Sequence, residues 1–205
     1  MGGPGKYIAV AGNIGAGKST LVEFLQYRFG LTPFYEPNAG NPFLEPFYGD
    51  MKRWAFHSQM FFLTHKFRLH QALSDHPGTV VQDRTIYEDA EIFALNLYRS
   101  GLMNAAEHET YRAMYDAITR TLRPPDLMIY LRADVRTVRR RIRLRGRPEE
   151  QKIPLDYIKR LHTLYEEWFS RYDRSPTLVL PIDRLDYIQD LVDRIEIIRT
   201  IERFL

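Results

Sequence analysis

The clearest chemical motif is the stretch GNIGAGKST, residues 12–20, which fits the pattern G-x-x-x-x-G-K-[ST] at every fixed position. An apolar run precedes the motif and an amphipathic segment follows it, and a phosphate-binding loop requires this strand-then-helix context. In such a loop, backbone N–H groups and the N-terminus of the following helix attract phosphate oxygens. The motif therefore predicts a nucleoside-triphosphate site. Its expected binding residues are Gly12, Asn13, Ile14, Gly15, Ala16, Gly17, Lys18, Ser19 and Thr20.

Two side chains of this motif have expected roles of their own. Lys18 would place its charge against the β- and γ-phosphates, and the Ser19 hydroxyl would bind Mg²⁺. A triphosphate site alone does not say what happens to the γ-phosphate, because GTPases, motors and small-molecule kinases all have one. The residues that gather around the site must decide between these classes.

Asp83 and Arg84 open the stretch DRTIYED, directly after the apolar run TVVQ. Ligands bind at the carboxyl ends of strands in a parallel sheet, so we expect both residues near the phosphate loop. Asp83 could act on Mg²⁺, directly or through water, and Arg84 could hold an anion. For this pair alone, the alternative is a surface ion pair that closes a strand.

Glu36 stands between the apolar pair Phe34–Tyr35 and Pro37. The proline holds the residue before it extended, and the loop that carries Glu36 should open on the same edge of the sheet. A kinase that phosphorylates a hydroxyl benefits from a carboxylate that accepts the departing proton. Glu36 is therefore the candidate general base. A GTPase would instead need base-specific loops, and the sequence contains no N-K-x-D stretch.

Seven arginines fall within residues 136–147. Arg141 and Arg145 are four residues apart and so share one face of a helix, which Gly146 should end. Arg145 and Arg147 could close over the phosphates as a lid and neutralise charge on the transferred group. A basic, solvated helix end is the simpler alternative, and a nucleic-acid surface is another.

The hydrophobic pattern supplies the elements that must position these residues. Short, nearly continuous apolar runs predict buried strands, and longer amphipathic segments predict helices. The expected strands are 7–11, 34–35, 79–82, 127–131 and 177–180, and the expected helices are 18–29, 51–74, 86–99, 105–121, 134–145, 154–171 and 186–203. This alternation indicates an α/β fold with a parallel sheet between two layers of helices. No repeat or linker divides the chain, so we expect one domain.

The composition excludes several classes of protein. The 205 residues contain no cysteine, which rules out disulfides, zinc–thiolate sites and a cysteine nucleophile. The start of the sequence has no signal-peptide pattern, and no uncharged run approaches the ~18 residues of a membrane span, so we expect a cytoplasmic protein without a membrane partner. The net charge is only +3 and the arginine run lacks interleaved aromatic residues, which disfavours a nucleic-acid partner.

Together, these motifs resemble those of the deoxynucleoside kinase family, bacterial type. The matching stretches are GNIGAGKS, Glu36–Pro37, W-x-F-x-x-Q, DRTIYED and RGRPEEQ-x-IPL-x-Y, in the family's order, from about residue 6 to 185. The resemblance implies a P-loop NTPase-type, three-layer fold with a five-stranded parallel sheet and a short, arginine-rich lid at about 143–153. It also implies one kinase domain over 1–205, a homodimer formed through helices at 51–74 and 86–121, and transfer of the γ-phosphate of ATP, with Mg²⁺, to the 5′-hydroxyl of a deoxynucleoside.

The resemblance assigns roles around the reacting hydroxyl and the sugar. Glu36 is similar to the family's base, and Arg84 to the arginine that helps to hold Glu36 and the 5′ end. Asp83 is similar to the acid near Mg²⁺. Tyr48 and Glu150 resemble the pair that binds the sugar 3′-hydroxyl, and Tyr48 would also crowd the 2′ position, which favours deoxyribose.

Further roles follow for the base pocket and the lid. Gln59 and Asp89 resemble the pair that reads the base, and Trp54 and Phe62 resemble walls of its pocket. The arginines expected near the ATP adenine and phosphates or in the lid are Arg141, Arg145 and Arg147.

Side-chain chemistry narrows the choice of base without fixing it. The Gln59 amide would pair with an acceptor nitrogen flanked by an amine, which adenine and cytosine offer. Asp89 could accept from the same amine, whereas guanine would set its O6 against the carboxylate unless a cation lay between them. Lys66, where some relatives carry arginine, is the candidate cation. The prediction is phosphorylation of deoxyadenosine, deoxycytidine or both.

Three alternatives to this prediction remain. The first is a deoxyguanosine kinase. The second is a thymidylate-like nucleoside monophosphate kinase, which would share the phosphate loop, an Asp-Arg pair and an arginine lid. The third is a nucleotide-dependent binding switch, which would hydrolyse the nucleotide slowly and would need no acceptor. The candidate base Glu36 and the Gln59–Asp89 pair disfavour the second alternative.

Overall fold

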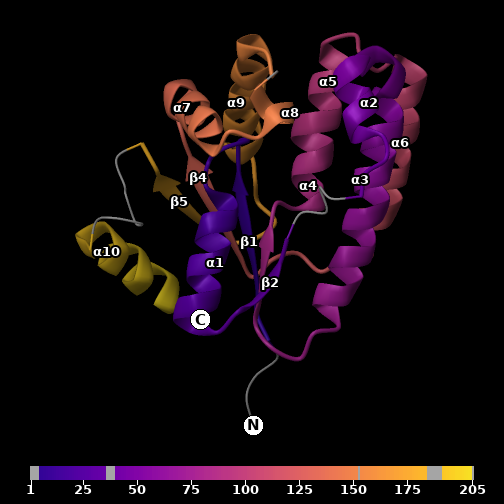
Figure 1. Cartoon of the computed structure of the whole chain (residues 1–205). Coiled ribbons are helices and arrows are strands. Elements are labelled where there is room, and N and C mark those ends of the chain that lie inside the picture. The colour runs from indigo at the N-terminus through magenta and orange to yellow at the C-terminus, as the bar shows by residue number, and fades with distance from the viewer. Residues whose placement is uncertain (1–4, 36–39, 152, 184–190, 205) are drawn as a thin grey trace.

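Five parallel strands form one sheet in the computed structural model of the chain, which describes residues 5–35, 40–151, 153–183 and 191–204 (Figure 1). The strands are β1 (Tyr7–Gly12), β2 (Thr32–Phe34), β3 (Val80–Asp83), β4 (Leu127–Arg132) and β5 (Thr177–Pro181), in the spatial order β2-β3-β1-β4-β5. Every neighbouring pair is parallel. The predicted α/β fold with a five-stranded parallel sheet is confirmed.

The strands follow the apolar runs of the sequence. All except β2 begin and end within one residue of the predicted bounds. β2 occupies Thr32–Phe34 rather than 34–35, because it pairs with β3 from Thr32 onward, opposite Val80. Pro33 is tolerated there because β2 is an edge strand, where a missing N–H breaks no ladder.

Helices cover both faces of the sheet, because successive residues of a strand point to opposite sides. Ala9 and Ala11 of β1 join one core cluster, and Ile8 and Val10 join the other. Figure 1 shows α3 and α6 on one side of the sheet and α1 and α10 on the other. The first core is shared with α3 (Met51–Ser74), α6 (Ala105–Thr119) and α9 (Leu155–Phe169), and the second with α1 (Lys18–Phe29), α7 (Val135–Arg145) and α10 (Leu191–Glu202).

Capping residues set helix ends close to the predicted positions. Asp50 caps α3 by accepting a hydrogen bond from Arg53 N at 3.1 Å. Asp134 caps α7 by accepting one from Thr137 N at 2.6 Å. α7 then ends at Gly146, whose φ of +70° favours glycine. As a result, α1 and α3 have the predicted bounds, and α7 begins one residue later than predicted.

The predicted helix over 86–99 is not one regular helix. It is divided into α4 (Ile86–Glu88), a π-helical segment η1 (Asp89–Ala94) and α5 (Leu95–Arg99). A π-helix bonds residue i to i+5, and such segments occur often at functional sites. Here the segment brings Asp89 and Phe93 to the same cavity. Hydrophobic periodicity predicts a helix over such a segment but does not predict the wider turn.

Two short helices were not predicted, namely α2 (Leu44–Gly49) and α8 (Pro148–Gln151). Each contains a proline, and α2 also contains a glycine, so neither has the pattern of a regular amphipathic helix. The predicted helices over 105–121 and 154–171 each end two residues early. Of the predicted helix over 186–203, residues 186–190 lie outside the described residues, and α10 ends at Glu202.

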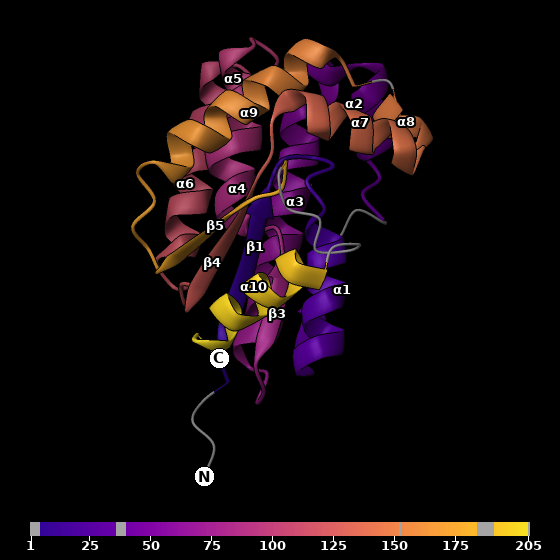
Figure 2. The ribbon, with the colours of Figure 1, turned by 90° about the vertical axis from the view of Figure 1, so that its left-hand side faces the viewer.

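The carboxyl ends of the strands form one edge of the sheet, because all five strands are parallel. Figure 2 shows α7, α8 and α9 across this edge, at the end of the sheet opposite the start of β1. Within the described ranges, no helix is both long and apolar enough to cross a membrane.

Candidate active site

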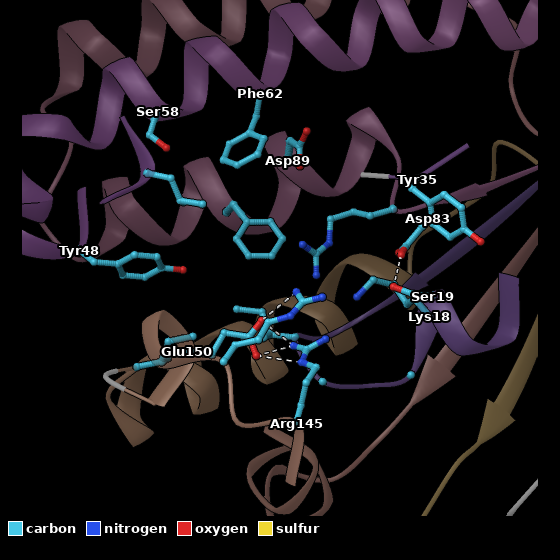
Figure 3. A pocket seen from close by; sticks show the side chains of 18 of the residues that line it. Lys18, Ser19, Tyr35, Tyr48, Ser58, Phe62, Asp83, Asp89, Arg145 and Glu150 are labelled. Carbon is cyan, nitrogen blue, oxygen red and sulfur yellow. Dashed lines mark hydrogen bonds and ion pairs between the residues drawn. The ribbon is translucent and has the colours of Figure 1, made fainter. Parts of the chain in front are cut away.

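A cavity of about 800 Å³ opens at the carboxyl edge of the sheet. The phosphate loop (residues 12–20), the ends of β2 and β3, α2, α3, η1 and the lid (residues 143–153) all contribute to its walls. Figure 3 shows Lys18, Ser19 and Asp83 at one end and Tyr48, Ser58 and Phe62 at the other. The cavity therefore has a charged end that suits phosphates and a more apolar end that suits a base and sugar.

The phosphate loop contributes most of its predicted residues to the cavity. The lining residues among them are Ile14, Gly15, Gly17, Lys18, Ser19 and Thr20. Gly17 caps α1 with a φ of +93°, a backbone conformation that favours glycine. Gly12, Asn13 and Ala16 support the loop from behind; Asn13, for example, accepts a hydrogen bond from Ile14 N at 2.8 Å.

Lys18 is held by the backbone of the same loop. Its Nζ donates to Gly12 O at 2.9 Å and to Asn13 O at 3.1 Å, and the residue is only 7% exposed. The ammonium group therefore stands at the start of the loop, in a region from which water is largely excluded. Such a fixed charge can stabilise phosphates more strongly than the same charge in open solvent.

Ser19 and Asp83 meet beside Lys18, where a divalent cation could bind. Ser19 Oγ donates to Asp83 Oδ2 at 2.6 Å (Figure 3), and among the described residues the buried Asp83 Oδ1 has no hydrogen-bond partner. The negative charge of this corner also acts on the neighbouring Tyr35: burial first, and then the charges of Glu23 and Asp83, raise the pKa of its hydroxyl above the usual value. Mg²⁺ is usually held by one or two carboxylates together with phosphate oxygens, so this hydroxyl and this carboxylate fit the ion.

Arg84 reaches the cavity from an uncommon backbone conformation. Its φ is +60°, the only positive φ of a non-glycine residue in the part of the chain that the structure describes. This conformation costs about 1–2 kcal/mol. It is fixed by two hydrogen bonds, from Arg84 N to Val10 O at 3.0 Å and from Lys66 Nζ to Arg84 O at 2.9 Å. The guanidinium lies 4.6 Å from the centre of the Phe93 ring.

The apolar end of the cavity contains the residues predicted to read the base. Gln59, Phe62 and Asp89 all line it, and so does Tyr48. Gln59 Oε1 is buried without a hydrogen-bond partner among the described residues, so it can take part in a new bond. Lys66 Nζ lies 3.7 Å from Asp89 Oδ2, but Lys66 is fully buried and is not among the residues that line the cavity.

The lid is held by ion pairs between its own side chains. Arg145 Nη2 lies 2.6 Å from Glu150 Oε2, and Arg147 Nη1 lies 3.5 Å from Glu150 Oε1. All three residues line the cavity, and Figure 3 shows the Arg145–Glu150 pair below the open space. The lid arginines therefore already face the site, with a carboxylate between them.

Arg141 and Trp54 lie beside the cavity rather than in its lining. Arg141 Nη1 donates to Ala16 O at 2.9 Å, so this side chain supports the phosphate loop from α7. Trp54 stacks on Phe43 with ring centroids 5.8 Å apart. Neither residue is among the described residues that line the cavity, and their roles toward ATP and the base stay predictions.

Glu36 and Pro37 lie outside the described residues. Tyr35, the residue before Glu36, lines the cavity beside Ser19 and Asp83. The chain therefore enters the segment that carries Glu36 from the edge of the site.

Several residues of the site were not predicted to have a role. Tyr35, Phe93 and Tyr157 line the cavity, and burial raises the pKa of Tyr157 well above the usual value of a tyrosine. Glu88 is fully buried next to the phosphate loop. The pattern T-x-x-E from Thr85 to Glu88 is a capping box that indicates a helix start, and this signal could have drawn attention to Glu88.

Comparisons with known proteins agree with this arrangement. A family model described as deoxynucleoside kinase matches residues 8–205. The chain is 39% identical over 185 residues to a deoxyadenosine/deoxycytidine kinase of Bacillus subtilis, covering 89% of this chain and 85% of that protein. It is 37% identical over 197 residues to a deoxyguanosine kinase of Lactobacillus acidophilus, covering 91% of this chain and 85% of that protein. A solved deoxyadenosine kinase from M. mycoides, with the products dCMP and a flexible dCDP bound, has a TM-score of 0.85 at 31% identity, over 97% of this chain and all of that one.

Proposed function

The chain belongs to the deoxynucleoside kinase family, and we propose which nucleosides it phosphorylates and which side chains carry the reaction. It is an ATP-dependent kinase with a P-loop NTPase-type fold that transfers phosphate to deoxynucleosides. The observation that carries the proposal is one cavity with the phosphate loop at one end and Gln59 and Asp89 at the other. The γ-phosphate would enter from the first end, and the 5′-hydroxyl from the second.

We assign the general base to Glu36. Its neighbour Tyr35 lines the cavity next to Ser19 and Asp83, which supports a position for Glu36 near the transferred phosphate. Glu36 would accept the proton of the 5′-hydroxyl as the oxygen attacks. Arg84 would hold the 5′ end of the nucleoside and the transferred group, since it is fixed at the end of β3.

On the donor side, Lys18 would bind the β- and γ-phosphates. Ser19 and Asp83 would hold Mg²⁺, which would neutralise part of the phosphate charge. Arg145 and Arg147 would add charge from the lid once they leave Glu150 for the phosphates. Glu150 would then be available to the sugar 3′-hydroxyl together with Tyr48, which lines the same cavity.

For the base, we propose a preference for deoxyadenosine and deoxycytidine over deoxyguanosine. Lys66 was the candidate cation for guanine. Its Nζ donates to Arg84 O and lies 3.7 Å from Asp89 Oδ2, but the residue is fully buried and does not line the cavity, so it does not stand between Asp89 and a bound base. A guanine O6 would then meet the Asp89 carboxylate without a cation between them, which would repel it. An adenine or cytosine amine would meet the same carboxylate favourably.

Other predictions accompany this proposal. We propose that residues 1–205 form one kinase domain, that the chain forms a homodimer, and that the protein is cytoplasmic and binds neither nucleic acid nor a membrane.

An acceptor panel tests the proposed function. Labelled ATP and Mg²⁺ would be supplied with each of the four deoxynucleosides and, in parallel, with each monophosphate, using the wild type and Glu36→Gln. We expect turnover with deoxyadenosine and deoxycytidine, little with deoxyguanosine, and at least ~10²-fold lower turnover for Glu36→Gln with nearly unchanged nucleoside binding. Phosphorylation of monophosphates alone would refute the proposal, and turnover of Glu36→Gln within about threefold of wild type would refute the role of Glu36.

A further inference from the structure

The carboxylate of Glu88 is fully buried between three parts of the active site. Oε1 accepts hydrogen bonds from Gly12 N at 3.2 Å and from the Tyr165 hydroxyl at 2.9 Å. Oε2 accepts from Thr85 N at 2.7 Å and from Thr85 Oγ1 at 3.2 Å. A carboxylate buried without such partners would be strongly destabilising, but here both oxygens are paired.

The first of these contacts fixes the start of the phosphate loop. Gly12 is the last residue of β1 and the first of the loop, and its carbonyl oxygen accepts a hydrogen bond from Lys18 Nζ at 2.9 Å. The peptide unit that presents Gly12 N to Glu88 is thus adjacent to the group that holds the lysine. By holding Gly12, Glu88 therefore helps to fix the position of Lys18, the phosphate-binding lysine.

The second contact fixes the residue after Arg84. Thr85 N is the next amide along the chain from Arg84, whose φ of +60° must be imposed by its neighbours. Val10 O and Lys66 Nζ hold the peptide groups of Arg84, and Glu88 holds the amide that follows. Glu88 Oε1 also lies 3.9 Å from Arg84 Nε, so it attracts the guanidinium directly.

The third contact reaches the helix that follows the lid. Tyr165 is a buried residue of α9, and α9 also carries Tyr157, which lines the cavity. One carboxylate therefore connects the phosphate loop, the residue after Arg84 and α9. These are the parts that must keep a fixed distance if phosphate is to pass in line from donor to acceptor.

We propose that Glu88 is a positioning residue for phosphoryl transfer, which acts by setting Arg84 and the start of the phosphate loop relative to each other. This inference rests on the proposed function, since Arg84 and Lys18 are assigned by it. Glu88 is not among the described residues that line the cavity, so it would act through Arg84 and the phosphate loop rather than on a substrate. A neutral side chain of the same shape, glutamine, cannot replace the negative charge or accept all four hydrogen bonds. If its amide nitrogen took the place of Oε2, that nitrogen would meet the Thr85 N–H, and two donors would face each other.

The first test compares Glu88→Gln with Glu91→Gln. Glu91 is the nearest matched control, because it lies three residues further along and pairs with Arg112 at 2.8 Å and Arg171 at 3.2 Å, away from the site. We expect Glu88→Gln to lower kcat at least ~10-fold with KM for both substrates within about threefold, and Glu91→Gln to leave both unchanged. A folded Glu88→Gln with kcat within about twofold of wild type would overturn the proposal.

A double-mutant cycle separates positioning from a general structural role. If Glu88 acts through Arg84, then Glu88→Gln should reduce kcat far less in an Arg84→Gln background than in the wild type. Fully additive losses would mean that Glu88 does not act through Arg84, and would overturn that part of the inference.

Tyr165→Phe keeps the proposal testable if Glu88→Gln does not fold. This change removes one hydroxyl that donates to Glu88 and leaves its other partners in place. We expect kcat to fall about threefold with unchanged KM, and an unchanged kcat would count against the inference. A wild type that is inactive toward every nucleoside would instead refute the proposed function, so the two failures are distinguishable.

Discussion

The floor of the active site (phosphate loop, Asp83, Arg84 and Glu88) and the lid above it hold their charges in different ways. On the floor, Lys18, Arg84 and Glu88 are at most 8% exposed. Lys18 Nζ donates to backbone carbonyls, Glu88 accepts from two backbone amides and two hydroxyls, and the Arg84 guanidinium lies 3.9 Å from Glu88 Oε1. In the lid, Arg145 and Arg147 have side chains that are 34% and 49% exposed, and both contact one carboxylate. The floor is therefore fixed by the sheet, whereas the two lid arginines are held by side-chain pairs that can be exchanged.

The energies of the two kinds of contact differ accordingly. Exposed ion pairs contribute about 0–1 kcal/mol. The lid arginines reach solvent while Glu150 is 11% exposed, so these pairs lie between exposed and buried ones, and a phosphate can displace Glu150 at a lower cost than it could break a contact of the floor. Removing one partner of a buried charge costs about 3–5 kcal/mol, because the other charge stays unpaired. The comparison implies that floor substitutions should affect kcat and that lid substitutions should affect mainly substrate binding.

Lys18→Met should have the largest effect. It removes the charge that the floor holds against the phosphates, and we expect kcat to fall by ~10³-fold while the fold is retained. Steady-state kinetics with saturating deoxyadenosine would measure the loss. Lys159→Met is the control, since Lys159 pairs only with exposed Asp156 among the contacts that the structure describes. A loss confined to the KM for ATP would contradict the view of the floor as fixed.

Glu150→Gln should have an effect of intermediate size, and it should change KM rather than kcat. Without the carboxylate, the lid arginines are released for ATP, so we expect KM for ATP to fall by about threefold and KM for the nucleoside to rise by up to ~10-fold. Glu109→Gln, on the exposed side of α6, is the matched control. A rise in KM for ATP, or a loss of kcat as large as that of Lys18→Met, would remove the distinction between floor and lid.

Asp134→Ala should have the smallest effect, on stability alone. Its carboxylate caps α7, the helix that leads into the lid, and its loss should cost about 1 kcal/mol and lower Tm by about 2–4 °C with kcat unchanged. The hydrogen bond from Thr137 N lowers the pKa of Asp134 below 3.8, so the stabilisation is present above that pH and is lost as the pH falls further.

Thermal unfolding at neutral pH and near pH 3 would check this prediction. The difference between wild type and Asp134→Ala should be largest at neutral pH and should shrink as Asp134 becomes protonated. Asp156→Ala, at an exposed position in the first turn of α9, should shift Tm less. A Tm difference that grows as the pH falls would contradict the assigned cap.

The parts of the fold that depend on regular periodicity were predictable from the sequence. α3 has the predicted bounds, and two of the site residues predicted on it, Gln59 and Phe62, line the cavity. The phosphate loop was predictable because its glycines, lysine and serine are each required at fixed spacing. The rest depends on contacts between distant segments, which a local pattern does not contain.

Three features illustrate that limit. The positive φ of Arg84 is imposed by Val10 and Lys66, which come from two other elements. The π-helical turn at 89–94 is decided by packing, since its sequence is compatible with an ordinary helix. The ion pairs of Glu150 with Arg145 and Arg147 depend on α8, a short helix that carries Glu150 and that the hydrophobic pattern does not predict.

The close packing of the phosphate loop against α7 has a consequence for how this enzyme can be altered. A methyl group on Gly15 would come within 2.9 Å of Ile142 Cγ1 and 3.2 Å of Val138 O, so a side chain at position 15 requires the Ile142 side chain to shift and the backbone of α7 to give way slightly. Because α7 ends in the lid at Arg145, a substitution in the phosphate loop that moves α7 would also move the backbone of Arg145. Libraries intended to alter the phosphate donor should therefore vary Gly15, Val138 and Ile142 jointly rather than one at a time.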